Sequence, residues 1–285
     1  MLAGPVGSRT HFRFNRAVPP RSQGIYGIKI PPLGLSHPEA LSGQLGCRSP
    51  ASMTIPTYSG YHFPGDVIQR AVWMYLRFTL SYRDVEDLLA ERGIEVSYET
   101  VRRRVLTFGP AIARRLRARR PKPHRRWHLD EMFVRIGGRQ MYLWRAVDAE
   151  GEVLDVLVQA RRDKAAARKL MRKLLKKQGI APTEWVTDKY RVYGSVLRDL
   201  GTRPQAHVTG KRSNNRAESS HVPIRRRERK LQRFKSPRSA QRFLSLHAAT
   251  YNVFTVARHL TTARTHRLFR AEALAAWREA AGICA

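Results

Sequence analysis

Three acidic residues stand out because the chain around them is very basic. Asp130 lies in "WHLDE", Asp188 in "VTDK" and Glu218 in "NNRAESSH". Carboxylates that converge repel one another unless a cation neutralises them, and oxygen ligands favour a hard ion such as Mg²⁺ or Mn²⁺. Two such ions about 3.5–4 Å apart can activate an attacking oxygen and stabilise a leaving oxygen in phosphodiester cleavage. The three residues are therefore candidate ligands of two metal ions.

Each carboxylate also has a simpler interpretation. Glu131 follows Asp130 and points to the opposite face of a strand, so one of the two is expected to be a surface charge, and the strand register decides which. Asp188 could cap a helix, and Glu218 could form a surface ion pair with its arginines, which would contribute little stability.

The charge of the chain indicates a polyanionic partner. There are 54 Lys and Arg against 22 Asp and Glu, a formal charge of +32 over 285 residues. We expect double-stranded DNA as the partner and a cytoplasmic location, since no run of about 18 apolar residues and no signal-peptide core is present. Cys47 and Cys284 are too few for a disulfide framework and too far apart for a zinc knuckle, which favours a reducing compartment.

The segment from Trp127 predicts the fold that would bring the carboxylates together. "WHLDEMFVRIGG", "RQMYLWRAVDAEG" and "EVLDVLVQA" read as three antiparallel strands. A helix capped by Asp163 and closed by Gly179, the short strand "EWVTD" and the helix "YGSVLRDLG" follow. This order predicts an α/β, RNase H-like domain. Its first and fourth strands are neighbours, so Asp130 and Asp188 should converge although they are 58 residues apart.

An all-α helix-turn-helix DNA-binding domain is expected before the α/β domain, over residues 53–113. "DVIQRAVWMYLRF" gives one amphipathic helix, and Ser81 with Asp84 marks the start of a second. A third helix begins near Ser97 and is expected to present base-reading and phosphate-binding groups to a major groove. Those groups are Arg102, Arg103 and Arg104, with Tyr98 or Thr100 near the groove. A small helical bundle with solvated arginines is the alternative.

The other segments are expected to serve as connections and tails. Residues 1–52 hold seven of the 16 prolines and seven of the 19 glycines and predict a disordered, dispensable extension. Residues 114–126 hold eight basic residues, with Pro121 and Pro123 preventing a continuous helix, and are expected to form a linker that tracks phosphates. The catalytic domain is expected over 127–256 and a helical tail over 257–285.

Several motifs in order resemble one family. "WHLDE", "VTDK" and "NNRAESSH", followed by "RRRER" and "RFKS", resemble the insertion-sequence transposases of the IS-six family, as do "LSYRDVEDLLAERGIEVSYETVRRRV" and "YLWRAVDAEGEVLDV". The resemblance runs from about Gly60 to about Val256. It implies that Asp130, Asp188 and Glu218 form the Asp-Asp-Glu triad. The 29 residues between Asp188 and Glu218 are fewer than in many such transposases.

The resemblance also implies a function and supporting residues. The protein would bind the terminal inverted repeats of its own element, free a 3′-hydroxyl by hydrolysis and join it to target DNA, with cointegrate formation by replicative transposition. Joining two ends implies at least a homodimer. DNA would be held by basic residues around the site, namely Arg225, Arg226 and Lys189. Asn214, Asn215 and His221 would orient the DNA or the segment that bears Glu218; local capping by the asparagines and packing of the histidine are the alternative. The rival interpretations are a helix-turn-helix regulator without catalysis and a structural RNA binder.

Overall fold

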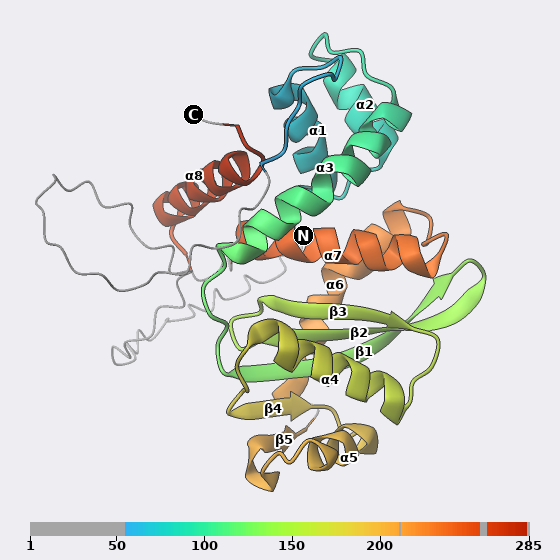
Figure 1. Cartoon of the computed structure of the whole chain (residues 1–285), viewed down its shortest axis with the longest axis vertical. Coiled ribbons are helices and arrows are strands. Elements are labelled where there is room, and N and C mark those ends of the chain that lie inside the picture. The colour runs from blue at the N-terminus through green and yellow to red at the C-terminus, as the bar shows by residue number, and fades with distance from the viewer. Residues whose placement is uncertain (1–54, 211, 257–260, 284–285) are drawn as a thin grey trace, which may run out of the picture. The chain divides into compact units, whose positions relative to one another are not determined.

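A computed structural model of the chain describes residues 55–210, 212–256 and 261–283 (Figure 1). The helices are α1 Gly65–Arg77, α2 Tyr82–Ala90, α3 Tyr98–Ala118, α4 Lys164–Gln178, α5 Arg191–Asp199, α6 Asn215–Lys230, α7 Pro237–Phe254 and α8 Ala263–Ala280. The strands are β1 Arg126–Ile136, β2 Arg139–Asp148, β3 Val153–Gln159, β4 Glu184–Thr187 and β5 His207–Thr209. Cys47, Cys284 and the extension over 1–52 lie outside the described residues.

The five strands form one mixed sheet in the order β3-β2-β1-β4-β5. β1, β2 and β3 are antiparallel neighbours, whereas β4 lies parallel to β1 and β5 parallel to β4. This is a mixed α/β, RNase H-like fold, as predicted. The first and fourth strands are neighbours, which confirms the pairing on which the convergence of Asp130 and Asp188 depends. The short strand β5 was not predicted.

Local sequence explains why the first hairpin forms. Ile136 pairs with Arg139, and the two residues between them, Gly137 and Gly138, have φ values of +55° and +79°. A two-residue hairpin of this kind needs positive φ at both positions, which glycine adopts at little cost. The hairpin fixes the register of β1 and therefore the face to which each carboxylate points.

Helices cover both faces of the sheet (Figure 1). On one face, Leu129 and Trp144 pack in an apolar cluster with residues of α4 and α5. On the other, Met132 and Val134 belong to a cluster that continues through α6 and α7 into the N-terminal helices. β1 therefore alternates between two buried faces, as expected of a central strand.

The predicted helix ends are present. Ser81 and Asp84 form a capping box at the start of α2, and Asp163 accepts a hydrogen bond from the Ala166 backbone N–H at 2.8 Å. Gly179 ends α4 with φ +66°. These signals depend only on residues within one turn, which is why the sequence alone reveals them.

The last helix, α8, packs on the N-terminal helices. Trp277 is fully buried and donates a hydrogen bond from Nε1 to Gln69 Oε1 at 2.9 Å. The helix expected within the tail over 257–285 thus contributes to the same apolar cluster as α1 and α3. None of the helices in the described ranges is long and apolar enough to span a membrane.

Candidate active site

Asp130 and Asp188 are brought level by the pairing of β1 with β4. The last residues of that ladder are His128 and Val186, which are register partners. Asp130 lies two residues after His128, within β1, and Asp188 lies two residues after Val186, directly after the end of β4. Two neighbouring parallel segments therefore carry one carboxylate each at the same height of the sheet.

Asp130 is shielded from solvent. Its side chain is 13% exposed, and Oδ1 accepts a hydrogen bond from the Glu131 backbone N–H at 2.9 Å. Burial and, to a smaller extent, the neighbouring carboxylates of Glu131, Asp188 and Glu218 together raise the pKa of Asp130 to about 7. The three candidate ligands thus lie close enough to influence one another electrostatically.

Glu131 is not a surface charge. Its side chain is 1% exposed and pairs with Arg162, the closest N–O distance being 2.5 Å, and the Tyr193 hydroxyl donates to its other oxygen. The expectation that one member of the Asp130–Glu131 pair faces solvent was wrong, because helices cover both faces of β1 at this point. Burial raises the pKa of Glu131, while Tyr193 and Arg162 lower it.

Arg162 is a residue that the sequence analysis missed. Besides Glu131, its Nη2 lies 3.8 Å from Asp188 Oδ2, and its guanidinium stacks 3.9 Å from the centroid of the Tyr190 ring. It therefore holds positive charge between the carboxylates of two strands. Only the tertiary fold reveals this role, since no spacing in the sequence links Arg162 to Glu131.

Glu218 lies in the first turn of α6 and is exposed. Within the described residues it forms no ion pair, so the surface salt bridge considered from the sequence is absent there. A carboxylate without a cationic partner in so basic a segment is available to a ligand. Its place near the N-terminal end of α6 also suits a negative charge.

Two contacts fix the start of α6 on the sheet. Asn214 is fully buried and donates from Nδ2 to the Leu129 carbonyl oxygen at 2.9 Å, so its side chain ties α6 to β1 and does not cap the helix. Asn215, the next residue, is exposed. His221 Nδ1 lies 3.7 Å from Asp130 Oδ2, and burial, with smaller effects of Arg145 and Arg225, lowers its pKa to about 3. His221 is thus a neutral neighbour of Asp130.

α6 continues through Pro223, with no break in the helix from Asn215 to Lys230. Glu218 and Arg225 are seven residues apart and therefore lie on the same side of the helix. Arg225 is held within the protein: Nη1 donates to Glu228 Oε2 at 2.9 Å and Nη2 to the Phe133 carbonyl oxygen at 2.8 Å. This orientation keeps the guanidinium against β1.

The donor atoms suit a hard divalent cation. Asp130, Asp188 and Glu218 supply only carboxylate oxygens, and burial, with a smaller effect of the neighbouring carboxylates, disfavours the ionised form of Asp130 in a way that a bound cation would offset. In the part of the chain that the structure describes, no three His, Cys, Asp or Glu side chains lie close enough to form a complete metal site. Glu218 is exposed and the Asp188 side chain is 34% exposed, so both have room to reorient towards Asp130 when an ion binds.

Comparison with known proteins identifies the family. Residues 124–256 match the DDE domain family. The chain is 36% identical over 174 residues to "Transposase for insertion sequence-like element IS431mec" from Staphylococcus aureus, covering 60% of this chain and 77% of that one. The chain belongs to the IS-six family of insertion-sequence DDE transposases. It is 34% identical, with the same coverage, to "Transposase for insertion sequence element IS257 in transposon Tn4003" from the same species.

The transposase is an enzyme, a polynucleotidyl transferase that catalyses DNA transposition. The rival interpretation as a regulator without catalysis is therefore excluded. Among solved structures, a match was found to the simian T-cell lymphotropic virus intasome in complex with PP2A regulatory subunit B56 gamma. The match covers 51% of this chain and 55% of the matched chain in that structure, at 15% identity and a TM-score of 0.37. A match to the Mos1 strand transfer complex covers 85% of this chain and 81% of the matched chain, at 12% identity and a TM-score of 0.33.

The arginines of α3 in the transposase differ in their surroundings. Arg102 and Arg103 are exposed and both pair with Glu99, at 2.7 and 3.1 Å. Arg104 is partly buried, and its guanidinium lies 4.2 Å from the centroid of the Tyr61 ring. Arg102 and Arg103 are accordingly the residues of this group that can reach a ligand. Near the carboxylates, Arg226 and Lys189 are exposed as well.

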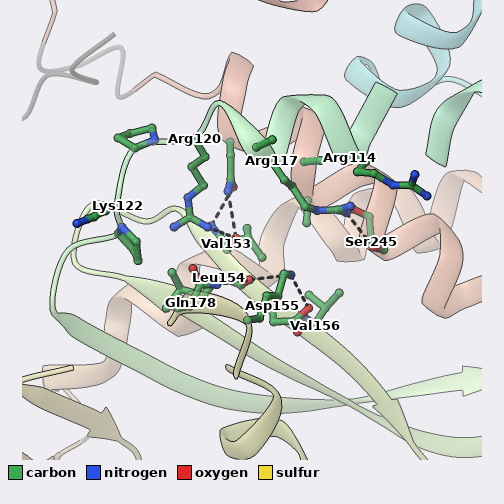
Figure 2. A pocket seen from close by; sticks show the side chains of 17 residues that line it. Arg114, Arg117, Arg120, Lys122, Val153, Leu154, Asp155, Val156, Gln178 and Ser245 are labelled. Carbon is green, nitrogen blue, oxygen red and sulfur yellow. Dashed lines mark hydrogen bonds and ion pairs between the residues drawn. The ribbon is translucent and has the colours of Figure 1, made fainter. Parts of the chain in front are cut away.

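The basic segment 114–126 is less free than the sequence suggested. α3 extends to Ala118 and ends before Pro121, so the first part of the segment is helical. Arg117 donates to the Ser245 hydroxyl at 2.8 Å, and Arg120 pairs with Glu152 at 2.5 Å. Arg117, Arg120 and Ser245 border a cavity of about 400 Å³ between α3, β3 and α7 (Figure 2). Part of the positive charge expected to track phosphates instead connects α3 to the sheet.

Proposed function

We propose that this transposase binds the terminal inverted repeats of its element, frees a 3′-hydroxyl by hydrolysis and joins it to target DNA at a site formed by Asp130, Asp188 and Glu218. The observation that supports the proposal is that Asp130, shielded from solvent on β1, is influenced electrostatically by Asp188 at the end of β4 and by Glu218 on α6. The relatives are transposases of particular insertion elements, which supports action on the element's own ends.

Asp130, Asp188 and Glu218 would hold Mg²⁺ or Mn²⁺, with two ions in the site. Such ions would activate the attacking oxygen and stabilise the leaving oxygen, whether the nucleophile is water or a 3′-hydroxyl. Other side chains of the protein position the carboxylates. Asn214 ties α6 to β1, and neutral His221 leaves the charge of Asp130 for the cation.

End recognition is assigned to the helix-turn-helix formed by α2 and α3. Gly93, with φ +69°, lies in the turn between them, and the first turns of α3 present Arg102 and Arg103 to solvent. A helix that enters the major groove reads base edges and touches phosphates with such side chains. The domain limits proposed are 53–113 for end binding and 127–256 for catalysis.

The overall reaction is assigned as replicative, with cointegrate formation, by a homodimer or larger assembly on DNA. The family resemblance supports the replicative route. Two element ends must be joined in one event, which supports more than one active site in the assembly.

The experiment combines end binding with strand transfer. Purified protein, a duplex ending in the element's inverted repeat and a target plasmid are incubated with Mg²⁺. Asp130→Asn and Asp188→Asn should abolish joining and leave end binding within about twofold, because neutralising a ligand removes ion affinity and leaves α3 unchanged. Glu150→Gln, which removes an exposed charge from the β2–β3 turn, is the matched control and should behave as wild type. Normal joining by either Asn variant would exclude that residue from the site.

A further inference from the structure

Phe133 is an exposed aromatic residue close to the candidate active site. It lies on β1, three residues after Asp130, and is 59% exposed, whereas its neighbours Met132 and Val134 are buried. A single exposed apolar residue is ordinary on a protein surface. The surroundings of Phe133 are what distinguish it.

Arg225 lies against Phe133. Its guanidinium carbon is 5.2 Å from the ring centroid, and Nη2 donates to the Phe133 carbonyl oxygen at 2.8 Å. Glu228 accepts from Nη1 at 2.9 Å and so restrains the guanidinium further. The ring and the guanidinium therefore form a fixed pair, while the ring keeps most of its surface open to solvent.

A second aromatic residue lies across the ladder. Tyr142 on β2 is the register partner of Phe133, and opposite residues of an antiparallel pair share a face of the sheet. The Tyr142 hydroxyl accepts a hydrogen bond from Gln140 Nε2 at 3.0 Å. Polar and aromatic groups, and not a broad apolar patch, thus surround Phe133, which argues against a protein-docking surface.

The position along β1 connects Phe133 to the carboxylates. Glu131 lies two residues before it on the same face of the strand and is held by Arg162, which also approaches Asp188. Asp130 points to the opposite face of β1, so the link to the candidate site runs through Arg162, which reaches Asp188 from the face that carries Glu131 and Phe133. A nucleotide next to a phosphodiester held at Asp188 would have its base on this face. Exposed basic residues nearby, Arg135 on β1 and Arg226 on α6, would attract its phosphates.

We propose that Phe133, backed by Arg225, is a stacking site for an unpaired base at the DNA end that the transposase processes. Every base has a π-face, so an aromatic ring can hold an unpaired base of any sequence, and an adjacent guanidinium strengthens the interaction. Removing a terminal base from the duplex stack would give the carboxylates access to the adjoining phosphodiester. This inference rests on the proposed function, because it assumes that a DNA end occupies the site.

The test compares strand transfer from two precleaved element ends, one fully paired and one with its last two base pairs mismatched. Phe133→Ala should join the paired end about tenfold more slowly than wild type, the loss expected for one base–aromatic contact, and should join the mismatched end at nearly the wild-type rate. Phe133→Trp should retain joining of both ends. Phe133→Leu, which keeps an apolar side chain without a π-face, should resemble Phe133→Ala.

A binding measurement separates this inference from the proposed function. With 2-aminopurine as the terminal base and no divalent ion added, wild-type protein should raise its fluorescence on binding the end, and Phe133→Ala should not. Leu268→Ala, which removes an exposed apolar residue from α8, is the control and should match wild type in both assays. Equal slowing of Phe133→Ala on both ends, no slowing, or normal joining by Phe133→Leu would each overturn the stacking site. A wild-type protein that neither binds nor joins ends would instead overturn the proposed function.

Discussion

Arg145 on β2 lies directly opposite Asp130 on β1, yet its guanidinium bonds to α6. Nε donates to the Ser220 hydroxyl at 2.8 Å, and that hydroxyl donates to the Ala217 carbonyl oxygen at 2.6 Å. Arg145 is completely buried, and its two terminal nitrogens have no hydrogen-bond partner among the described residues. The turn of α6 that carries Glu218 is thus fixed to the sheet beside Asp130 by a buried cation.

This arrangement predicts an order of stability for two substitutions. Ser220→Ala should lower the free energy of unfolding by about 1.5–3 kcal/mol, because it leaves a buried charge without its hydrogen bond. Arg145→Met should cost less, since it removes the charge and keeps an apolar side chain of similar length. Urea unfolding of both variants measures the difference. If Arg145→Met were the more destabilising, the guanidinium would have stabilising contacts beyond Ser220.

The raised pKa of Asp130 predicts a pH dependence. Between its ordinary value of 3.8 and about 7, the folded protein holds a proton that the unfolded chain has released. Stability without metal should therefore decrease as the pH rises through this window, by at most about 1.4 kcal/mol per pH unit from this group. Thermal unfolding of wild type and Asp130→Asn across pH 4–8 measures the contribution of Asp130 to this pH dependence.

Metal binding should show the opposite trend, because the ion competes with the proton. The apparent affinity for Mn²⁺ should rise as the pH increases from about 5 to 7, by up to about tenfold per pH unit, and level off above pH 7. Titration calorimetry at fixed pH values measures it. An affinity independent of pH in this range would mean that Asp130 is not a ligand.

The arginines of α3 should contribute unequally to DNA binding. Arg103→Ala should lower the slope of log affinity against log salt by about 0.9, the value for one phosphate contact, whereas Arg104→Ala should leave the slope unchanged because its guanidinium packs on Tyr61. Glu99→Gln should tighten binding, since Glu99 pairs with Arg102 and Arg103 in the free protein. Salt titrations with the element's end test all three. An unchanged slope for Arg103→Ala would place the phosphate contact elsewhere.

Glu218 and Arg225 should have separable roles although both lie on one side of α6. Glu218→Gln should eliminate joining at any Mg²⁺ or Mn²⁺ concentration, because it removes a ligand. Arg225→Ala should retain metal-dependent cleavage and bind ends more weakly, most clearly at high salt. Cleavage rates over a range of metal concentrations distinguish them. Recovery of Arg225→Ala by added metal would assign Arg225 to support of the metal site.

The sequence predicts structural features that depend on residues close together in the chain. The capping box of Ser81, the αL glycine Gly179 and the alternation along β1 each follow from a few consecutive positions, and the strand order follows from the order of elements. This was enough to place Asp130 next to Asp188. Glu218 stood out as a carboxylate within a basic segment, and the family resemblance implied its place in the triad.

The contacts that depend on distant segments could not be predicted. Glu131 is buried because α5 brings Tyr193 over it, and Arg145 bonds to a serine 75 residues later. Arg227 shows the same limit: it lies in a run of arginines typical of a solvated surface, but it is buried and donates to the Leu80 carbonyl oxygen at 3.0 Å. A charge run in a sequence does not indicate which of its members turns inward.

The central claim, that Asp130, Asp188 and Glu218 act as one metal site, is tested most directly by iron-mediated cleavage of the protein itself. Fe²⁺ bound in place of Mg²⁺, with ascorbate and peroxide, generates radicals that cut the polypeptide next to the ion's ligands. We predict cuts near all three residues in wild type, suppressed by excess Mg²⁺ and absent at all three positions in Asp130→Asn, with Glu150→Gln unchanged. Cuts at only one of the three positions, or cuts that persist in Asp130→Asn, would contradict a shared site.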